Sequence, residues 1–387
     1  MCAKATRSGS PASASTIRRA CRRFGLRIVV KLGSSSVTGA DGAISHDTLL
    51  SIASQIAAIR LSGHAPVIVS SGAIAAGLHT LGIIDKRPSD LSILQAISAV
   101  GQSRLMDAYN RALGEYGLIA GQVLLTPLDF INRQQYLHAR ETLETLLGFN
   151  VIPVVNENDA VADDEIRFGD NDRIAALVAN LISADLLVLL TDQIGVYTSD
   201  PRLDAAASLV EEIDEFSEVL KEAAGGPGTE RGSGGMASKL QAASIASWSG
   251  VDVLIASATR ESVLVEACDR KPGLGTYISK RQIRLSARKL WIAFANPAVG
   301  RVYVDNGARS AIVEHSKSLL SVGVHSFEGS FLEDDPVEIC DLAGNVIAKG
   351  LARVSAEDLP LALKPNISGA QGSSSILIHR DDLVVLV

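Results

Sequence analysis

Short apolar runs alternate with amphipathic stretches up to about residue 265, and most of the apolar runs end in polar residues. The apolar runs are rich in Val, Ile and Leu and have the length of buried strands. They occupy residues 27–31, 66–70, 119–125, 151–155, 186–190 and 251–256. Between them, helical spacing of apolar residues covers residues 45–61, 91–113, 140–147, 174–182, 213–224 and 239–248. This alternation predicts an α/β fold with a mostly parallel sheet sandwiched by helices.

The pattern changes after residue 270. Residues 271–290 are first rich in glycine and then basic, which is typical of a linker. Residues 291–387 hold short strand-like runs separated by turn signals such as Ala343-Gly344-Asn345. We therefore expect a large α/β domain over residues 27–270, a linker over 271–290 and a small β-rich domain over 291–387.

Composition narrows the class of protein. The chain has 387 residues, 47% hydrophobic and only 4% aromatic, which favours a soluble α/β core. No apolar run approaches the ~18 residues that a membrane helix needs. The formal charge of −7 gives no general attraction for nucleic acid or anionic lipid. The four cysteines form no C-x-x-C pair and the histidines no H-E-x-x-H motif, so we expect a reducing, cytoplasmic location and no transition-metal site.

Residues 1–26 differ from the rest of the chain. They are rich in Ser, Ala and basic residues, and no acidic residue occurs before Asp41. This composition resembles a transit peptide, but no clear amphipathic helix emerges. We expect a disordered basic extension. Two alternatives remain: a targeting segment, or a start site assigned too far upstream.

Two polar clusters lie close together in the middle of the chain. Asn156-Glu157-Asn158-Asp159 follows the strand at 151–155, and Gly169-Asp170-Asn171-Asp172 precedes the apolar run at 174–182. Carboxyl ends of strands in open α/β sheets face the ligand crevice, and Asp or Asn before a helix can cap it. A turn and an N-cap would explain either cluster alone. Together they indicate a polar ligand site, and the Asp residues could help hold a hard cation such as Mg²⁺.

Lysines, glycines and hydroxyl groups supply the complementary chemistry. Lys31 ends an apolar strand just before Gly33 and three serines, and a lysine inside such a strand is costly unless it is paired. Ser71 and Gly72 lie between a strand and a helix, where free N–H groups favour an anion. Lys239 follows a Gly-rich segment at residues 225–235.

Several phosphate-binding classes are excluded. There is no G-x-x-x-x-G-K-[ST] motif and no H-R-D or D-F-G motif. Residues 232–237 fit G-x-G-x-x-A, but a loop and not a strand precedes them, which argues against a dinucleotide site. Two distant lysines and a carboxylate cluster instead suit phosphoryl transfer, which depends mainly on electrostatic stabilisation of the moving group.

Seven ordered sequence blocks resemble the amino acid kinase family, and within it the glutamate 5-kinases that carry a C-terminal PUA domain. The blocks lie at residues 30–34, 69–77, 99–103, 153–159, 169–172, 190–192 and 234–239. The small domain resembles a PUA domain through residues 300–308, 318–324 and 331–339. Ser233 stands where the family usually has Thr, which keeps the hydroxyl group.

The resemblance implies transfer of the γ-phosphoryl group of ATP to the side-chain carboxylate of L-glutamate. The product would be L-glutamyl 5-phosphate, in the first step of proline biosynthesis, with feedback inhibition by proline. Carried over by position, the glutamate-binding residues are Ser71, Asp159 and Asn171. The ATP-binding residues are Lys31, Thr191, Asp192, Ser233, Gly234, Gly235, Met236, Ala237, Ser238 and Lys239. Lys31, Lys239, Asp170 and Asp172 would be catalytic, and the last two would also serve Mg²⁺.

The resemblance also implies a homodimer or homotetramer and functional coupling to glutamyl phosphate reductase. Residues 291–387 hold no strongly basic run, which argues against RNA binding by the PUA-like domain. We expect that domain to be dispensable for the chemistry, so that a chain ending near Lys280 is still active. A kinase acting on acetylglutamate, aspartate or carbamate is the nearest alternative. A regulatory RNA-binding protein with a vestigial kinase fold is another, although the candidate catalytic residues are intact.

Overall fold

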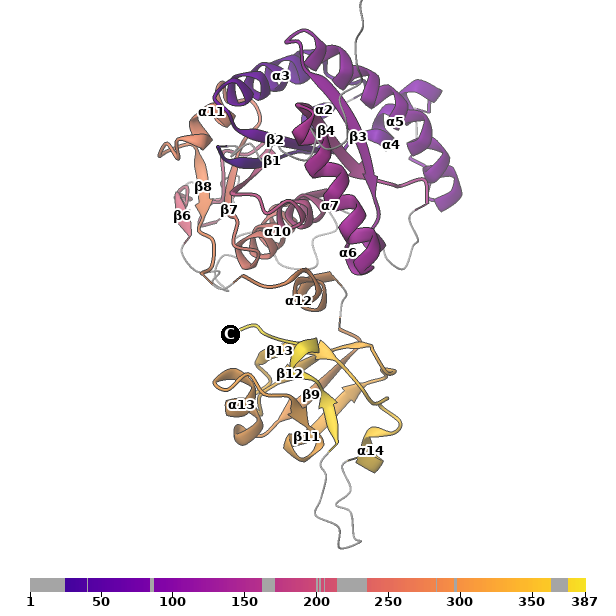
Figure 1. The fold of residues 1–387 in the computed structure, drawn as a ribbon, viewed down its shortest axis with the longest axis vertical. Coiled ribbons are helices and arrows are strands. Elements are labelled where there is room, and N and C mark those ends of the chain that lie inside the picture. The colour runs from indigo at the N-terminus through magenta and orange to yellow at the C-terminus, as the bar shows by residue number, and fades with distance from the viewer. Residues whose placement is uncertain are drawn as a thin grey trace, which may run out of the picture.

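The structure is a computed structural model of the 387-residue chain. It describes residues 25–39, 41–83, 87–161, 171–199, 201, 203–204, 206–213, 235–282, 284–295, 298–362 and 375–387. Figure 1 shows a larger body built around one sheet and a smaller body with its own sheet, with helix α12 between them. Nearly all of the predicted N-terminal extension lies outside the described residues.

The larger body contains an eight-stranded sheet of order β3-β4-β2-β1-β5-β7-β8-β6. Its strands are β1 (Arg27–Leu32), β2 (Ala65–Ser70), β3 (Ile119–Leu125), β4 (Val151–Glu157), β5 (Leu186–Thr191), β6 (Glu212–Ile213), β7 (Asp252–Ser257) and β8 (Gly275–Ile278). All neighbours pair in parallel except β7 and β8. The predicted α/β fold with a mostly parallel sheet is confirmed.

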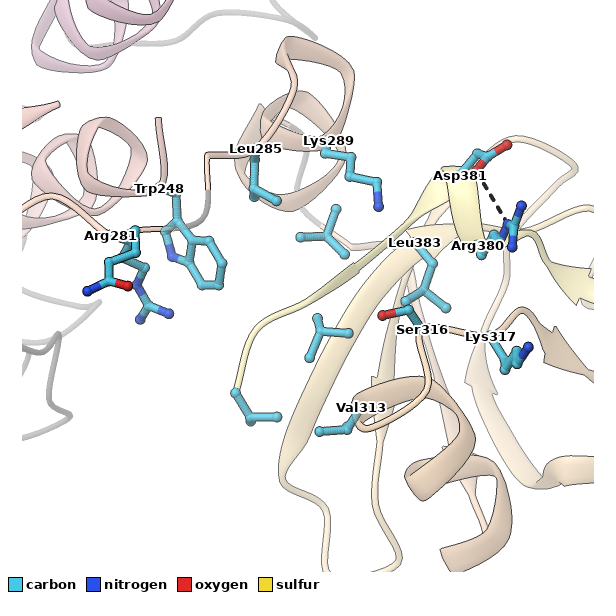
Figure 2. Close-up of a pocket in the computed structure, with 14 residues that line it drawn as sticks. Trp248, Arg281, Leu285, Lys289, Val313, Ser316, Lys317, Arg380, Asp381 and Leu383 are labelled. Atoms are coloured by element: carbon cyan, nitrogen blue, oxygen red, sulfur yellow. Dashed lines mark ion pairs between the residues drawn. The ribbon is translucent and has the colours of Figure 1, made fainter. Parts of the chain in front are cut away.

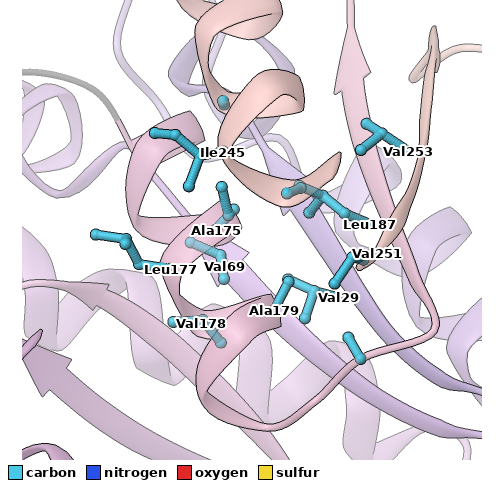
Figure 3. Packing of buried hydrophobic residues seen from close by; sticks show 14 of the residues in the cluster. Val29, Val69, Ala175, Leu177, Val178, Ala179, Leu187, Ile245, Val251 and Val253 are labelled. Carbon is cyan, nitrogen blue, oxygen red and sulfur yellow. The ribbon is translucent and has the colours of Figure 1, made fainter. Parts of the chain in front are cut away.

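Helices bury both faces of this sheet. The helices are α2 (Ser34–Val37), α3 (His46–Leu61), α4 (Ala73–Leu81), α5 (Leu91–Gly114), α6 (Pro127–Ile131), α7 (Arg133–Gly148), α8 (Asn171–Leu181), α10 (Met236–Trp248) and α11 (Val263–Cys268). Successive strand residues point to opposite faces, so Val29 packs under α7, α8 and α10 whereas Val30 packs under α3, α5 and α11. Figure 3 shows the first of these cores. Lys31 follows the same alternation and therefore lies on the α8 and α10 face.

Helices α4 and α5 approach each other very closely. A Cβ atom on Gly101 of α5 would lie 1.7 Å from the carbonyl oxygen of Ala73, the first residue of α4. Only glycine fits at this contact, because any side chain would overlap the backbone of α4. The contact fixes the middle of α5 beside the start of α4, which follows Ser71.

The smaller body holds a five-stranded sheet of order β11-β9-β12-β13-β15. Its strands are β9 (Gly300–Val304), β11 (Val324–Gly329), β12 (Pro336–Cys340), β13 (Val346–Leu351) and β15 (Leu383–Val385), beside a two-stranded pair of β10 (Leu319–Leu320) and β14 (Ile376–Ile378). The helices are α13 (Asn306–Val313) and α14 (Leu359–Ala362). The predicted small β-rich domain is confirmed, although α13 was not predicted.

The junction differs from the predicted linker. Strand β8 lies within residues 271–290, yet it pairs with β7 and β6 of the large sheet. Its glycine neighbours and short length gave no strand signal. After it come α12 (Ala287–Leu290) and the π-helix η2 (Trp291–Ala295). Leu290 is fully buried in the large core, so the linker prediction was wrong for these two parts.

A groove of about 680 Å³ lies at this junction (Figure 2). The guanidinium carbon of Arg281 lies 3.8 Å from the centroid of the Trp248 ring on one side of it. Arg288 forms an ion pair of 2.6 Å with Asp382 of the small domain. The first contact fixes the segment after β8 against α10 of the large body, and the second joins the same segment to the small domain.

Most of the helix predicted at residues 213–224 lies beyond the short strand β6. Ile213 ends the short strand β6, and the rest of the helix predicted at 213–224 lies outside the described residues. Within the described part of the chain, no helix combines the length and the apolar character needed to cross a membrane.

Candidate active site

Five parallel strands end at the same edge of the large sheet. They are the adjacent strands β4, β2, β1, β5 and β7. Polar or glycine residues directly follow four of them, namely Asn158 after β4, Ser71 after β2, Gly33 after β1 and Asp192 after β5. Carboxyl ends of neighbouring parallel strands form the ligand crevice in open α/β sheets. The predicted site residues therefore come from loops that meet at one edge.

One carboxylate holds two lysines at the centre of this edge. Lys31 Nζ lies 2.6 Å from Asp172 Oδ1, and Lys239 Nζ lies 3.0 Å from Asp172 Oδ2. The residues come from β1, the first turn of α8 and the first turn of α10. Asp172 is 0% exposed, Lys31 3% and Lys239 6%. Among the described residues, two ammonium groups thus meet at one buried carboxylate, and ammonium groups attract phosphate oxygens.

Burial and charge act in opposite directions on Asp172. Burial alone would raise its pKa, because it penalises the charged form. The ammonium groups of Lys31 and Lys239, with their hydrogen bonds, outweigh burial and leave the pKa of Asp172 below its ordinary value. The carboxylate is therefore ionised at neutral pH and can orient both lysines.

A chain of side-chain amides extends from the neighbouring residue. Asn171 Nδ2 lies 2.7 Å from the carbonyl oxygen of Ser70, 2.9 Å from Ser71 Oγ and 2.8 Å from Asn156 Oδ1. Asn156 Nδ2 in turn donates to Gln102 Oε1 at 2.8 Å. The chain connects the ends of β2 and β4 with helix α5.

Helix α5 also contacts Asp159. Ser98 Oγ donates to Asp159 Oδ2 at 3.1 Å, and this bond holds the carboxylate beside the end of β4. Ser98 and Gln102 are one helical turn apart, so they face the same side of α5. Two polar side chains on this buried face thus contact Asn156 near the end of β4 and Asp159 just after it.

The predicted nucleotide side is described in part. Thr191 Oγ1 donates to Asp192 Oδ1 at 2.9 Å, directly after β5. Ser238 Oγ donates to Asp172 Oδ2 at 3.2 Å, so the start of α10 is tied to the lysine cluster. Gly235 is the N-cap of α10, and no side chain of the described residues caps that helix. Met236 and Ala237 lie in its first turn.

The structure thus relates most of the predicted site residues to one another. Lys31, Lys239 and Asp172 are brought together by ion pairs, and Ser71 and Asn171 by a hydrogen bond. Thr191 and Asp192 lie at the end of β5, beside β1 in the sheet. Asp170, Ser233 and Gly234 lie outside the described residues.

Ser98, Gln102 and Asn156 were not among the predicted site residues. Ser98 and Gln102 lie in a long apolar-periodic helix and are 3% and 8% exposed. Their only signal was a pair of polar residues, four apart, on a face that the apolar residues assign to the core. Asn156 stood within the recognised polar cluster after β4.

The described residues do not by themselves form a metal site. They contain no group of three His, Cys, Asp or Glu side chains placed to hold an ion. Both oxygens of Asp172 contact lysine ammonium groups, so this carboxylate is engaged otherwise. Within the described residues, the site fits a phosphate-bearing ligand better than a free cation.

Comparisons with protein families match both bodies. The model of the amino acid kinase family matches residues 26–257. The PUA domain model matches residues 300–365.

Relatives match almost the whole chain. It is 41% identical over 364 residues to the glutamate 5-kinase of Aliivibrio fischeri, which covers 93% of this chain and 98% of the relative. It is 44% identical over 365 residues to that of Cupriavidus taiwanensis, with coverage of 93% and 98%. A solved structure, carbamate kinase from Giardia lamblia bound to AMP-PNP, has a TM-score of 0.49 and 19% identity, over 66% of this chain and 99% of that one.

Proposed function

Because the chain belongs to the amino acid kinase family, in the group of glutamate 5-kinases with a PUA domain, we propose that it phosphorylates the side-chain carboxylate of L-glutamate with ATP. The product is L-glutamyl 5-phosphate, and the reaction is the first step of proline biosynthesis.

The observation that carries the proposal is the pairing of Lys31 and Lys239 on Asp172. Among the described residues, two ammonium groups face one carboxylate in a buried site. A low-dielectric site of this kind strengthens the attraction for phosphate oxygens. It lies directly beside amide and hydroxyl groups that can bind an amino acid.

In the proposed mechanism, the lysines act on the phosphoryl group in transit. A Cβ atom on Gly33 would lie 3.8 Å from Lys31 Nζ, so this ammonium group lies at the turn after β1. Lys31 and Lys239 stabilise the charge that spreads over the equatorial oxygens as the bond to ADP breaks. Asp172 keeps both lysines oriented. Because its carboxylate is ionised, it attracts both ammonium groups and offsets the repulsion between them. Asp159, Asn171 and Ser71 hold the amino acid, so that a carboxylate oxygen faces the γ-phosphorus.

Thr191, Asp192 and the segment from Ser233 to Lys239 are proposed to bind ATP. Magnesium is proposed to arrive with the nucleotide, because Mg²⁺ commonly binds substrate phosphates and waters with few protein ligands. It would neutralise part of the phosphate charge. Asp170 stays a predicted metal ligand, and Asp172 is assigned primarily to the lysines.

A hydroxamate assay tests the function. Purified protein with ATP and Mg²⁺ is given glutamate, aspartate or acetylglutamate, and the acyl phosphate is trapped with hydroxylamine. Turnover of glutamate well above the other two supports the proposal. Turnover of aspartate or acetylglutamate in preference to glutamate, or of none of the three, contradicts it.

The remaining implications of the family are also proposals. They are feedback inhibition by proline at or near the glutamate site, assembly as a homodimer or homotetramer, functional coupling to glutamyl phosphate reductase, and a cytoplasmic location. The small domain is proposed to stabilise or assemble the protein and not to bind RNA.

A further inference from the structure

Gln102 has a buried hydrogen-bond donor with no partner among the described residues. Its side-chain nitrogen, Nε2, is fully enclosed, and the residue is 8% exposed. An amide N–H group left unsatisfied in a protein interior costs about 1–3 kcal/mol. Such groups are normally paired, so an unpaired one beside a ligand site indicates a ligand atom.

The orientation of the Gln102 amide is set by backbone groups. The N–H group of Glu157 donates to Asn156 Oδ1 at 2.9 Å, so the nitrogen of Asn156 must point the other way. That nitrogen donates to Gln102 Oε1, which leaves Nε2 as the free end. Exchanging O and N in Gln102 would bring two nitrogens together, so the free atom is a donor and not an acceptor.

The place of Gln102 also favours an anionic group. Its neighbour Gly101 packs against Ala73 at the start of α4. Helix α4 has nine residues and the N-cap Gly72, and no side chain of the described residues caps it. Free N–H groups of a helix start and an unpaired amide donor are together suited to a carboxylate.

The amide chain indicates which carboxylate of glutamate this is. Asn171 adjoins Asp172, which holds the lysines, and Gln102 is reached from Asn171 through Asn156. The reacting carboxylate must lie near the lysines. On the basis of the proposed function, we propose that Gln102 Nε2 donates a hydrogen bond to the α-carboxylate of glutamate and thereby selects substrates that carry it.

Gln102→Glu separates binding from a purely structural role. The variant keeps an oxygen that accepts from Asn156 but replaces the donor with a second acceptor. The variant and wild type are each assayed with glutamate and with the glutamate analogue in which a carboxamide replaces the α-carboxylate. The measured quantity is kcat/KM, or the inhibition constant for the analogue if it is not turned over. We expect the preference for glutamate over the analogue to fall about 10- to 100-fold, with the KM for ATP unchanged.

Gln55→Glu is the matched control. Gln55 is also buried, at 6% exposed, and its Oε1 accepts from the N–H group of Leu264 at 2.9 Å, outside the site. It reports the general effect of a buried glutamate and is expected to leave the preference unchanged. Should Gln102→Glu fail to fold, Gln102→Met removes the same donor at similar volume, and the preference should still fall.

If Gln102→Glu lowers kcat/KM equally for glutamate and for the analogue, or leaves the preference unchanged, Gln102 does not bind the α-carboxylate. The proposed function would still stand in that case, as long as wild type turns over glutamate. Absence of wild-type turnover of glutamate would instead overturn the proposed function and this inference with it.

Discussion

Lys31 Nζ lies 2.6 Å from Oδ1 of Asp172, and both side chains are almost completely buried. The other oxygen of the same carboxylate contacts Lys239. A single buried acid thus holds cations from the first strand of the large sheet and from a helix far along the chain. The arrangement explains why a lysine is tolerated inside an apolar strand, since a buried charge is stable only when it is paired.

Replacing either lysine should reduce the chemical step. Lys31→Ala and Lys239→Ala each remove one positive charge from the transition state, and we expect kcat to fall about 10²–10³-fold with a smaller effect on binding. The measurement is kcat at saturating ATP and glutamate, after circular dichroism has shown that the variant folds.

Lys280→Ala is the control for loss of a lysine. Lys280 lies at the surface, with its side chain 53% exposed, and pairs loosely with Asp252 at 3.6 Å. Its kcat should match that of wild type. A folded Lys31 or Lys239 variant that keeps kcat within about threefold, well short of the expected loss, would remove the paired-lysine mechanism.

Asp172→Asn should destabilise the fold as well as reduce activity. It removes the charge of the carboxylate that both buried ammonium groups contact, and breaking a buried ion pair typically costs about 3–5 kcal/mol. The pKa of Asp172 is lowered in the folded state, so its contribution is fully present above the ordinary value of 3.8 and is lost as pH falls through the lower folded value.

Urea unfolding of wild type and Asp172→Asn at several pH values checks this sign. The stability difference should be constant near neutral pH and should narrow only below about pH 4, where the wild-type carboxylate becomes protonated. A difference that grows on acidification would contradict the assignment of the ion pairs.

Asp159→Asn should affect glutamate more than ATP. The change removes a charge that we assign to the α-amino group of the substrate, and a charge-assisted hydrogen bond contributes about 1.5–3 kcal/mol. The KM for glutamate should rise by about one to two orders of magnitude while that for ATP stays near wild type. Ser98→Ala removes only the hydrogen bond that holds Asp159 and should give a smaller rise. Equal changes in both KM values would exclude Asp159 from the substrate site.

Six of the eight strands of the large sheet, and the ends at which the site lies, were predictable from sequence. Runs such as the one around Val154 are buried on both faces, so they consist of continuous apolar residues and stand out from the helices. The pairing of Lys31 could be anticipated from the cost of burying it. Its partner could not be chosen from the residues alone, because Asp170 and Asp172 were equivalent candidates at the start of the next helix.

Other features could not be predicted, because the local sequence pattern at these positions differs from what the tertiary contacts impose. Gly307 lies in the first turn of α13 and reads as a turn, although Asp305 caps that helix by accepting from the N–H group of Ala308 at 2.8 Å. Gln102 is a polar residue on the buried face of α5, and its hydrogen-bond partner Asn156 lies in β4. Such positions depend on contacts that no local pattern contains.

The structure moves the point at which the small domain can be removed. Leu290 is buried in the large core, and Arg284 donates to the carbonyl oxygen of Asn180 in α8 at 3.1 Å. A chain ending near Lys280 loses both contacts, and we expect it to fold poorly. A chain ending at Ala295 keeps them and should still phosphorylate glutamate. The two are compared by circular dichroism and the hydroxamate assay; an active chain ending near Lys280 would show that the contacts are dispensable.

Lys349 of the small domain donates a hydrogen bond to the carbonyl oxygen of Ala293 at 3.4 Å and should make stability depend on pH. It is 7% exposed, on β13, and burial, together with a smaller effect of Arg173, lowers its pKa from 10.5 to about 8 despite the opposing effect of Glu338. The folded state therefore holds a costly buried ammonium below about pH 8, and stability should rise with pH between about 8 and 10.5.

Lys349→Met removes this ammonium group and should raise the unfolding temperature at neutral pH, by an amount that shrinks as pH rises above 8 because wild type then loses the same proton. Lys317→Met, at an exposed lysine of the same domain, is the control and should show no such trend.

Arg173→Met tests the docking of the two bodies, since Arg173 belongs to the large one: it should raise the pKa of Lys349 and move the pH dependence upward. If Arg173→Met leaves the pH profile unchanged, Arg173 does not act on the charge of Lys349 in solution.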